Sequence, residues 1–386
     1  MRTAINAVCP SINGGHKTYN NNIIKHLAKI DSKNQYFIFI SSDSIELFDG
    51  LPNNFKIIEV NSFINSSIKR LIWLQIFLPF KLKIMAVDIL LSPMNISPIM
   101  LRYFKIKSIL VNHLNLQWLY PNDMPGGRLR LHILCFFMEH SIYQSQKVIV
   151  DSENAKKELT NKLSVKGNKV DVIHLGVDIS KFNASHNPLM VKKLFKKYGI
   201  NNKYLLYVAN TTKHHNYIKL LEAYKLLNEN NNNYYQLCLI VQITNEKHYN
   251  EVLDYIKKNE LDNHVIVISN LQTELLSYFY QKATLYVFPS YCEVFGLTPL
   301  EAMSCGTPVI TSNVSAMPEI CGDAAMYFDP YDHKDIALKI NLLLHDLMLR
   351  NRLVRKGLKR VKYYSWENTA RKTLHVLEQT YNSNDI

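Results

Sequence analysis

The chain has 386 residues, which suits two domains of the usual size of about 100–200 residues. Hydrophobic residues make up 47% and charged residues 20%, a balance that is ordinary for a globular protein with a full core. The 45 basic residues exceed the 32 acidic ones, and the net charge of +13 indicates a polyanionic partner. Nucleic acid, an anionic membrane face and phosphorylated substrates are the candidates.

The cysteine and hydropathy patterns indicate in which cellular compartment the protein lies. The six cysteines are scattered, form no C-x-x-C pair and have no zinc-ligand spacing with histidine, which favours a reducing cytosol. The first residues, MRTAINAVCPSINGG, contain too short an apolar run for a signal peptide. No uncharged apolar run reaches about 18 residues, so no transmembrane helix is expected. We therefore expect a cytoplasmic protein whose membrane contact, if any, is peripheral.

Short apolar strands alternate with longer amphipathic segments along the chain, which favours an α/β fold with parallel sheets. The first half opens with a strand, followed by a glycine turn into a helix at 12–30. The strands expected in this half are 3–8, 36–41, 55–60, 88–92, 108–112, 147–152 and 169–178.

The pattern restarts after a short linker region at about 183–202. The second half is expected to contain helices at 217–229, 248–259 and 274–283, and strands at 204–211, 236–243, 264–269, 284–290, 308–313 and 325–330. A final helix follows in 363–381. Two successive doubly wound halves fit this order best, and ligands of such folds bind beyond the carboxyl ends of the strands.

The stretch CEVFGLTPLEAMSCGTPVITS, residues 292–312, carries two carboxylates eight residues apart, Glu293 and Glu301. Thr298 is suited to cap a helix with Pro299 in its first turn, and Glu301 then completes a capping box. The same geometry also suits a ligand. A helix N-terminus binds diphosphate, Gly296 permits close approach of the backbone, and a carboxylate one turn further accepts hydrogen bonds from a ribose.

This region resembles the C-terminal signature of the family 4 retaining glycosyltransferases, which have the GT-B fold. The resemblance rests on the two spaced glutamates, on CGTPVITSN and on PEICGDAA followed by Asp-Pro after the next strand. Weaker matches, among them INGGHKTY, DSENAKKEL, VIHLGVDISKF and SWENTARKTL, extend over nearly the whole chain.

The resemblance implies two Rossmann-like domains that face a central cleft. The N-terminal acceptor domain would be 1–182, the C-terminal donor domain 183–365, and the C-terminal helix 366–386 would pack back on the first domain. It also implies that Glu293 binds the donor sugar hydroxyls and Glu301 the ribose. The backbone that would hold the sugar and diphosphate belongs to Phe295, Gly296, Leu297 and Thr298.

In the first domain, the resemblance implies that Gly15 lets the first loop approach the phosphate and the acceptor. His113 follows a strand at a position where the family often has a histidine near the reacting centre. The alternative for His113 is a buried, hydrogen-bonded histidine at a strand end. No Asp-x-Asp occurs in the chain, so we expect no obligatory metal and no cofactor beyond the nucleoside-diphosphate sugar.

One departure from the family concerns the phosphate clamp. Where Arg-Lys-Asn or His-Lys-Asn is usual, this chain has His214, His215 and Asn216, so His215 replaces the lysine. We predict that His215 is a weaker cationic clamp and that activity falls above its pKa, a fall that His215→Lys would flatten. In the alternative, both histidines are loop residues and Lys213 reaches the diphosphate.

The expected reaction transfers a hexose, such as mannose, glucose or an N-acetylhexosamine, to a glycan or lipid-linked acceptor with retention, in the synthesis of surface polysaccharide or lipopolysaccharide. Two basic, aromatic segments, 68–85 and 126–137, are candidates for contact with an anionic membrane. The alternative for the first is a buried helix that is broken at Pro79.

Three other functions remain open at this stage. A sugar-nucleotide epimerase uses similar halves but needs no acceptor. A catalytically weak scaffold would explain the missing lysine. Nucleic-acid binding is suggested by charge alone, with no accompanying motif, so we expect no nucleic-acid partner.

Overall fold

The computed structural model describes residues 1–8, 14–60, 66–124, 127–185, 187–201, 203–230 and 235–383. The chain divides into two compact units. Unit 1 consists of Met1–Pro121, Gly126–Gly176 and Trp366–Ile386, and unit 2 consists of Asn122–Pro125 and Val177–Ser365. The main division therefore falls at Val177, six residues before the expected boundary at 183. The chain passes from unit 1 to unit 2 at Val177 and returns after Ser365. These two segments are hydrogen-bonded to each other, because the Val177 N–H donates to the Tyr364 carbonyl at 3.1 Å.

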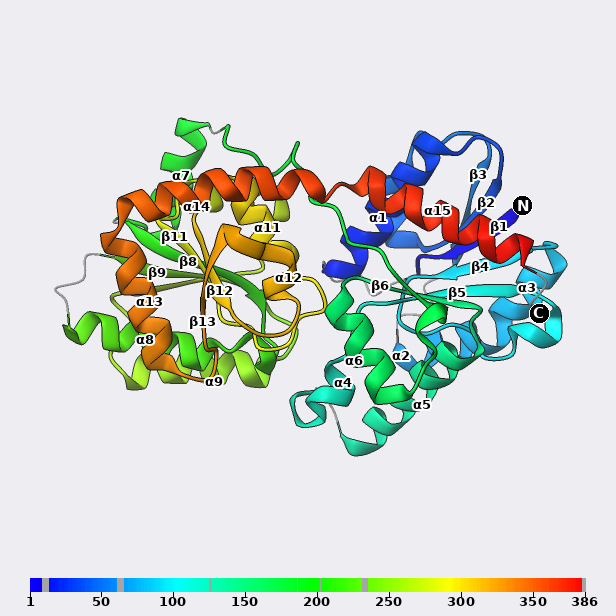
Figure 1. The fold of residues 1–386 in the computed structure, drawn as a ribbon, viewed down its shortest axis with the longest axis horizontal. Helices are drawn as coiled ribbons and strands as arrows, with labels where there is room; N and C mark the ends of the chain where they lie inside the picture. Colours follow the sequence, from blue (N-terminus) through cyan, green and yellow to red (C-terminus); the bar gives the residue numbers. More distant parts are fainter. Residues whose placement is uncertain are drawn as a thin grey trace. The chain divides into compact units, whose positions relative to one another are not determined.

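Unit 1 contains a parallel sheet with the strand order β3-β2-β1-β4-β5-β6-β7 among the described residues (Figure 1). The strands read as nearly continuous apolar runs because helices cover both faces of a parallel sheet. The order reverses between β1 and β4, and ligands of doubly wound sheets bind at the carboxyl edge beside such a switch point. The strands are β1 Arg2–Asn6, β2 Gln35–Ser41, β3 Phe55–Val60, β4 Ile89–Ser92, β5 Lys107–Asn112, β6 Lys147–Val150 and β7 Val170–Val172.

The helices of unit 1 include one from the far end of the chain. They are α1 Gly15–Ile30, α2 Ser67–Ile72, α3 Leu78–Ile84, α4 Leu116–Leu119, α5 Arg128–Gln144, α6 Glu153–Leu163 and α15 Trp366–Asn382. Helix α15 packs against α1 and reaches β4 and β5 (Figure 1). The Lys107 ammonium, at the start of β5, donates to the carbonyls of Thr380 and Tyr381 at 3.0 Å each and caps the end of α15.

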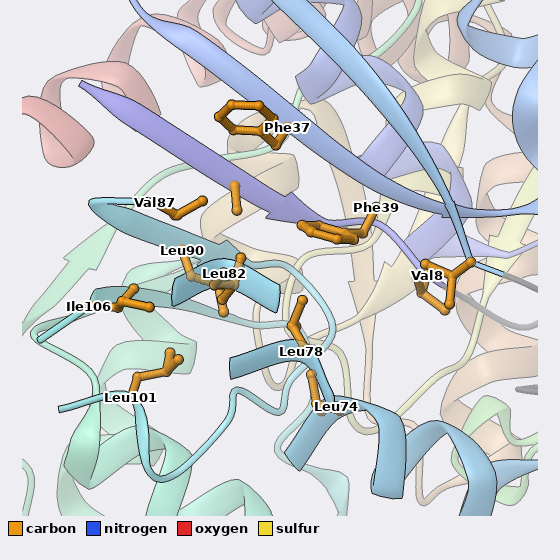
Figure 2. Packing of buried hydrophobic residues seen from close by; sticks show 12 residues of the cluster. Val8, Phe37, Phe39, Leu74, Leu78, Leu82, Val87, Leu90, Leu101 and Ile106 are labelled. Atoms are coloured by element: carbon orange, nitrogen blue, oxygen red, sulfur yellow. The ribbon is translucent and has the colours of Figure 1, made fainter. Parts of the chain in front are cut away.

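A π-helical turn, Trp73–Phe77, joins α2 to α3 into one continuous helical segment from Ser67 to Ile84. The predicted break at Pro79 is therefore wrong. Pro79 stands in the first turn of α3, where the wider turn before it accommodates a residue without an N–H. Figure 2 shows how one side of this segment enters the core: Leu74, Leu78 and Leu82 pack with Phe39, Leu90 and Leu101.

Unit 2 repeats the architecture with the strand order β10-β9-β8-β11-β12-β13, so its switch point lies between β8 and β11. Its strands are β8 Tyr204–Asn210, β9 Gln236–Gln242, β10 Val265–Ser269, β11 Leu285–Phe288, β12 Val309–Ser312 and β13 Ala325–Phe328. Its helices are α7 Pro188–Tyr198, α8 Tyr217–Asn230, α9 Glu246–Lys258, α10 Leu276–Lys282, α11 Leu297–Ser304, α12 Met317–Cys321, α13 His333–His345 and α14 Leu347–Arg360. Two parallel α/β halves confirm the expected fold class.

None of the helices within the described residues has both the length and the apolar character required to cross a bilayer.

Candidate active site

Two loops meet at the switch point of unit 2. The short turn Lys213–His215 follows β8, and the loop from Pro289 to Gly296 follows β11. The His214 carbonyl accepts hydrogen bonds from the Ser290 hydroxyl and the Tyr291 N–H, both at 3.0 Å. The Asn216 backbone is in the left-handed region, and its side-chain amide donates to the Pro289 carbonyl at 3.1 Å. These bonds hold the two loops against each other.

This pairing brings His215 and Glu293 together. The His215 Nδ1 lies 3.3 Å from the Glu293 Oε1, and the two side chains are only 10% and 16% exposed. The Tyr207 hydroxyl donates to the His215 carbonyl at 2.6 Å. Ser315 holds the other partner: its hydroxyl donates to the Glu293 carbonyl at 2.6 Å and accepts the Glu293 N–H at 2.9 Å. Hydrogen bonds to the backbones of His215 and Glu293 thus fix where these two side chains start.

Helix α11 begins beside Glu293. Its N-cap is Gly296, whose φ of 89° lies in the left-handed region that favours glycine. A Cβ at this position would collide with the Met317 side chain. The N–H groups of the first turn, from Leu297 and Thr298, have no partner inside the helix and suit an anion. Phe295 is buried and packs edge-on against Tyr364, with ring centroids 5.6 Å apart.

Glu301 does not have the expected capping role. The helix starts at Leu297 and not after Thr298, and no side chain caps its N-terminus. Glu301 therefore lies in the second turn, where its Oε2 accepts a hydrogen bond from the Tyr280 hydroxyl at 3.1 Å. Burial raises the pKa of Glu301 to about 7, although the Tyr280 hydrogen bond acts in the opposite direction. The predicted capping box is wrong, because local pattern alone does not show where Gly296 starts the helix.

Lys213 and His214 flank this cluster. Lys213 is exposed. The pKa of Glu251 on α9 is lowered chiefly by the His248 hydrogen bond, with a smaller contribution from the Lys213 charge. Burial, and next the neighbouring His215, lower the pKa of His214 well below its usual value. Whether Lys213 or His215 binds a diphosphate stays a prediction, since the charged neighbour of His215 in the structure is the Glu293 carboxylate.

A second polar cluster lies at the carboxyl edge of the unit 1 sheet. His113 directly follows β5, and Asp151 directly follows β6. The His113 Nδ1 lies 2.7 Å from the Asp151 Oδ2, and the His113 N–H donates to the Asn95 Oδ1 at 2.6 Å. Asp151 is almost wholly buried, so this pair fixes the histidine ring. The His113 Nε2 has no hydrogen-bond partner within the described residues.

Helix α1 contributes two further rings to this cluster. The Tyr19 and His113 ring centroids lie 4.5 Å apart, and those of His16 and His113 lie 5.5 Å apart. Burial, assisted by the charge of His113, lowers the pKa of His16 to about 3. Gly15 is exposed, and a Cβ there would meet no described atom within 4 Å. Internal packing therefore leaves room at Gly15 for an approaching ligand.

Sequence reasoning missed several supporting residues. Asp151 and Asn95 orient His113, while Tyr280 and Ser315 hold the two glutamates. Asp151 was detectable in principle, because polar residues that directly follow neighbouring parallel strands meet at one edge of the sheet. The others are contacts that only the folded chain creates.

Two family models match the chain. Residues 190–360 match "Glycosyl transferases group 1", and residues 13–181 match "Glycosyltransferase Family 4". Each model covers one of the doubly wound halves described above. The chain is a family 4 glycosyltransferase. Both halves of the glycosyltransferase thus carry the family pattern, and the candidate residues Gly15, His113, Glu293 and Glu301 lie within the matched ranges.

Relatives and solved structures agree with this assignment. The glycosyltransferase is 29% identical over 262 residues to O-antigen chain mannosyltransferase B of Escherichia coli, a match that covers 66% of each chain. A 26% match to the serotype-specific mannosyltransferase WbdA of Escherichia coli covers 59% of this chain but 28% of WbdA. The match thus spans just under two thirds of the first relative and under a third of the second.

The fold matches that of Anabaena Alr3699/HepE, solved in complex with UDP-glucose, with a TM-score of 0.78 and 14% identity over 98% of this chain and 100% of that one. This likeness confirms the GT-B fold.

Proposed function

We propose that this glycosyltransferase moves a hexose, such as mannose, glucose or an N-acetylhexosamine, from a nucleoside-diphosphate sugar to a saccharide or lipid-linked acceptor, with retention at the anomeric carbon. The product would belong to a surface polysaccharide or lipopolysaccharide. The observation that carries the proposal is the arrangement at the unit 2 switch point. Glu293, the α11 N-terminus and Glu301 follow one another as the sugar, diphosphate and ribose of such a donor do.

The donor half of the mechanism depends on charge stabilisation. The unpaired N–H groups and partial positive charge at the α11 N-terminus would stabilise the departing diphosphate. Gly296 lets the phosphates approach the backbone, and Glu301 accepts hydrogen bonds from the ribose hydroxyls. Glu293 orients the sugar, while His215 or Lys213 adds positive charge. These groups supply the stabilisation without an obligatory metal ion.

The acceptor half is assigned to unit 1. Asp151 engages the Nδ1 of His113 and leaves the Nε2 for a substrate hydroxyl. His113 then positions the reacting groups, since the fixed ring loses little entropy when substrate binds. Glu293 is read as a sugar-orienting group and not as a nucleophile. Gly15 lies at the start of α1, where the donor phosphate and acceptor need space.

The choice of donor is narrowed by what the relatives are called. The Escherichia coli proteins are named mannosyltransferases, and the Anabaena structure holds UDP-glucose. We therefore rank GDP-mannose first and UDP-sugars second as donors to test. The acceptor would be a growing O-antigen-like chain, by analogy with the first relative's name.

The test incubates the full chain with GDP-mannose or UDP-sugars, synthetic saccharide and lipid-linked acceptors, and EDTA. We expect one nucleotide to raise the melting temperature, and proton NMR to show an α-linked product from an α-linked donor. Glu301→Ala should lose the nucleotide stabilisation, whereas Glu274→Ala, a largely exposed glutamate, should keep it. Stabilisation by a nucleotide without sugar transfer would support the scaffold alternative. Conversion of the nucleotide sugar in the absence of an acceptor would support an epimerase. Loss of activity in EDTA would contradict metal independence.

A lipid-linked acceptor requires access to a membrane, and the helical segment from Ser67 to Ile84 offers a suitable face. Four residues of an α-helix overshoot a full turn by roughly 40°. The π turn, which is wider and rotates less per residue, offsets that drift. Side chains every four residues therefore remain on one side. They are all exposed: Ile68, Ile72, Ile76, Phe80 and Ile84.

Basic side chains accompany this apolar stripe. Lys69, Arg70, Lys81 and Lys83 belong to the same helical segment. An apolar stripe flanked by lysine and arginine suits the boundary of an anionic bilayer. We therefore propose that unit 1 docks peripherally on the cytoplasmic face of the membrane through this segment.

Vesicle flotation tests the membrane proposal. The full chain should float with vesicles that contain anionic lipid and not with purely zwitterionic ones. Phe80→Glu combined with Ile84→Glu should abolish flotation, whereas Met348→Glu, at an apolar residue of α14 whose exposure lies between those of Phe80 and Ile84, should not. Equal flotation of both variants, or flotation independent of lipid charge, would contradict the proposal.

A further inference from the structure

Three metal-ligating side chains converge at the unit 2 switch point. His214 and His215 come from the turn after β8, and Glu293 comes from the loop after β11. One ligand atom from each lies within 4.8 Å of the other two, and within the described part of the chain no other such group of three occurs. The loops that carry them are held together by the hydrogen bonds on the His214 carbonyl.

In the part of the chain that the structure describes, each of the three residues has a buried polar side-chain atom without a hydrogen-bond partner. The Nδ1 atoms of His214 and His215 and the Oε1 of Glu293 are buried, and none has a hydrogen-bond partner within the described residues. The His215 Nδ1 and the Glu293 Oε1 are close, but their geometry does not make a hydrogen bond. His215 is only 8% exposed. Burying a polar atom without a hydrogen-bond partner costs free energy of folding. A bound ligand that pairs with these atoms would remove that cost.

The spacing has the dimensions of a tetrahedral metal site. Zinc binds histidine nitrogen at about 2.0–2.1 Å and carboxylate oxygen at about 2.0–2.2 Å, which places two ligands of a tetrahedron about 3.3–3.5 Å apart. The His215 Nδ1 and the Glu293 Oε1 are 3.3 Å apart. The ligand atoms of any two of the three residues lie at most 4.8 Å apart. Each pair therefore needs to approach by no more than about 1.5 Å to reach the spacing of a tetrahedral site.

We propose that His214, His215 and Glu293 form a binding site for a zinc-like divalent ion, and that the ion and the sugar donor exclude each other. Two imidazoles and one carboxylate favour zinc or cobalt over magnesium or calcium, and three protein ligands leave the fourth position of a tetrahedron to a water molecule. The ion is a competing ligand and not a required cofactor.

The exclusion follows from the shared side chains, and this half of the inference rests on the proposed function. Glu293 is assigned to the donor sugar hydroxyls, and a metal on its Oε1 would remove that acceptor. An ion bound to Glu293 would also occupy the sugar end of the donor site. His214, in contrast, contributes its carbonyl to the loop framework, and the proposed function assigns it no contact with the donor.

Cobalt absorption tests the metal site directly, without reference to activity. Tag-free full chain, stripped of metal, is titrated with Co²⁺ in the absence of nucleotide. We expect saturation at one equivalent with the intense visible bands of tetrahedral cobalt, which added Zn²⁺ abolishes. His214→Gln and Glu293→Gln should each weaken binding at least about tenfold, because even residues that merely support ligands cost 10–100-fold.

The matched control is Glu251→Gln. Glu251 also lies against a histidine, His248, at 2.9 Å, but belongs to a pair and not to a group of three. It should bind Co²⁺ as the unaltered chain does. Wild-type absorption like that of free aqueous cobalt would overturn the site, as would equal binding by all three variants.

Exclusion is tested by adding a nucleotide sugar to the cobalt-loaded protein, without EDTA. The nucleotide sugar used is the one that raised the melting temperature in the earlier screen. It should remove the cobalt bands more effectively than an equal concentration of a nucleotide sugar that does not stabilise it, which controls for chelation in solution. Bands that persist under the stabilising donor would overturn exclusion. If no nucleotide stabilises the chain, the proposed donor site fails, while the cobalt spectrum still decides the metal site.

Discussion

Glu301→Gln should stabilise the protein at high pH, although the substitution lies in the proposed ribose site. Burial raises the pKa of Glu301 from its ordinary 4.5 to about 7. The folded chain therefore binds this proton more tightly than the unfolded chain, and stability falls as the pH rises from about 4.5 to about 7. Above pH 7 the folded protein carries the full cost of a partly buried carboxylate. Glutamine mimics the protonated form and avoids that cost.

The magnitude follows from linkage. The cost of ionising Glu301 is about 1 kcal/mol at pH 5 and at most about 3 kcal/mol at pH 8, because one pKa unit corresponds to 1.36 kcal/mol. For a unit of this size, 1 kcal/mol shifts the melting temperature by roughly 2–4 °C. The variant should thus melt up to about 6–12 °C higher at pH 8 and only about 2–4 °C higher at pH 5.

Differential scanning fluorimetry at the two pH values measures this difference. Glu274→Gln is the control, since backbone hydrogen bonding, together with the nearby Lys181, lowers the pKa of Glu274. That variant should show no gain at pH 8. A Glu301→Gln melting temperature that equals or falls below the wild-type value at pH 8, or a gain independent of pH, would refute the reasoning.

Three further predictions concern Asp151, Gly296 and the contact of Lys107 with the end of α15. Asp151→Asn should lower kcat about tenfold or more, measured in a transfer assay at saturating donor, because an amide no longer holds the required His113 tautomer; an unchanged kcat would show that Asp151 only supports the fold. Gly296→Ala should cost about 2–4 kcal/mol in urea unfolding, from the left-handed backbone and the collision with Met317, and should also weaken nucleotide binding. Lys107→Met should destabilise unit 1 by about 1–2 kcal/mol and speed amide exchange in the last turn of α15, because three carbonyls there lose their donor; exchange that stays slow would contradict this capping role.

Apolar periodicity was enough to locate the strands that form the two sheets. Buried parallel strands are continuous apolar runs, and segments such as 36–41 and 204–211 are recognisable without any knowledge of their neighbours. The division between the units was less accessible. Val177–Phe182 looks like the tail of the first half, but it belongs with unit 2, where the Ser304 hydroxyl donates to the Phe182 carbonyl.

The candidate site was only partly accessible from sequence. The spacing of Glu293 and Glu301 indicated a carboxylate on each side of a helix start, which the structure contains. Tyr280, the partner of Glu301, is 21 residues away in the sequence. The partners of Glu293 are Ser315, 22 residues away, and His215, 78 residues away, so no local sequence pattern predicts these contacts. The capping-box prediction failed for a related reason. T-P-L-E satisfies the pattern, yet the left-handed Gly296 had already begun the helix.

The return of α15 to unit 1 has a consequence for how the protein is made. Unit 2 is inserted within unit 1, and the Lys107 contact with α15 joins residues 273 positions apart. A ribosome therefore completes unit 2 before unit 1 has received its last helix. During synthesis, the α1 surface that later contacts α15 stays uncovered. Unit 1, whose synthesis starts first, must therefore finish folding last, and a chain interrupted near residue 365 would leave a complete unit 2 attached to an incomplete unit 1.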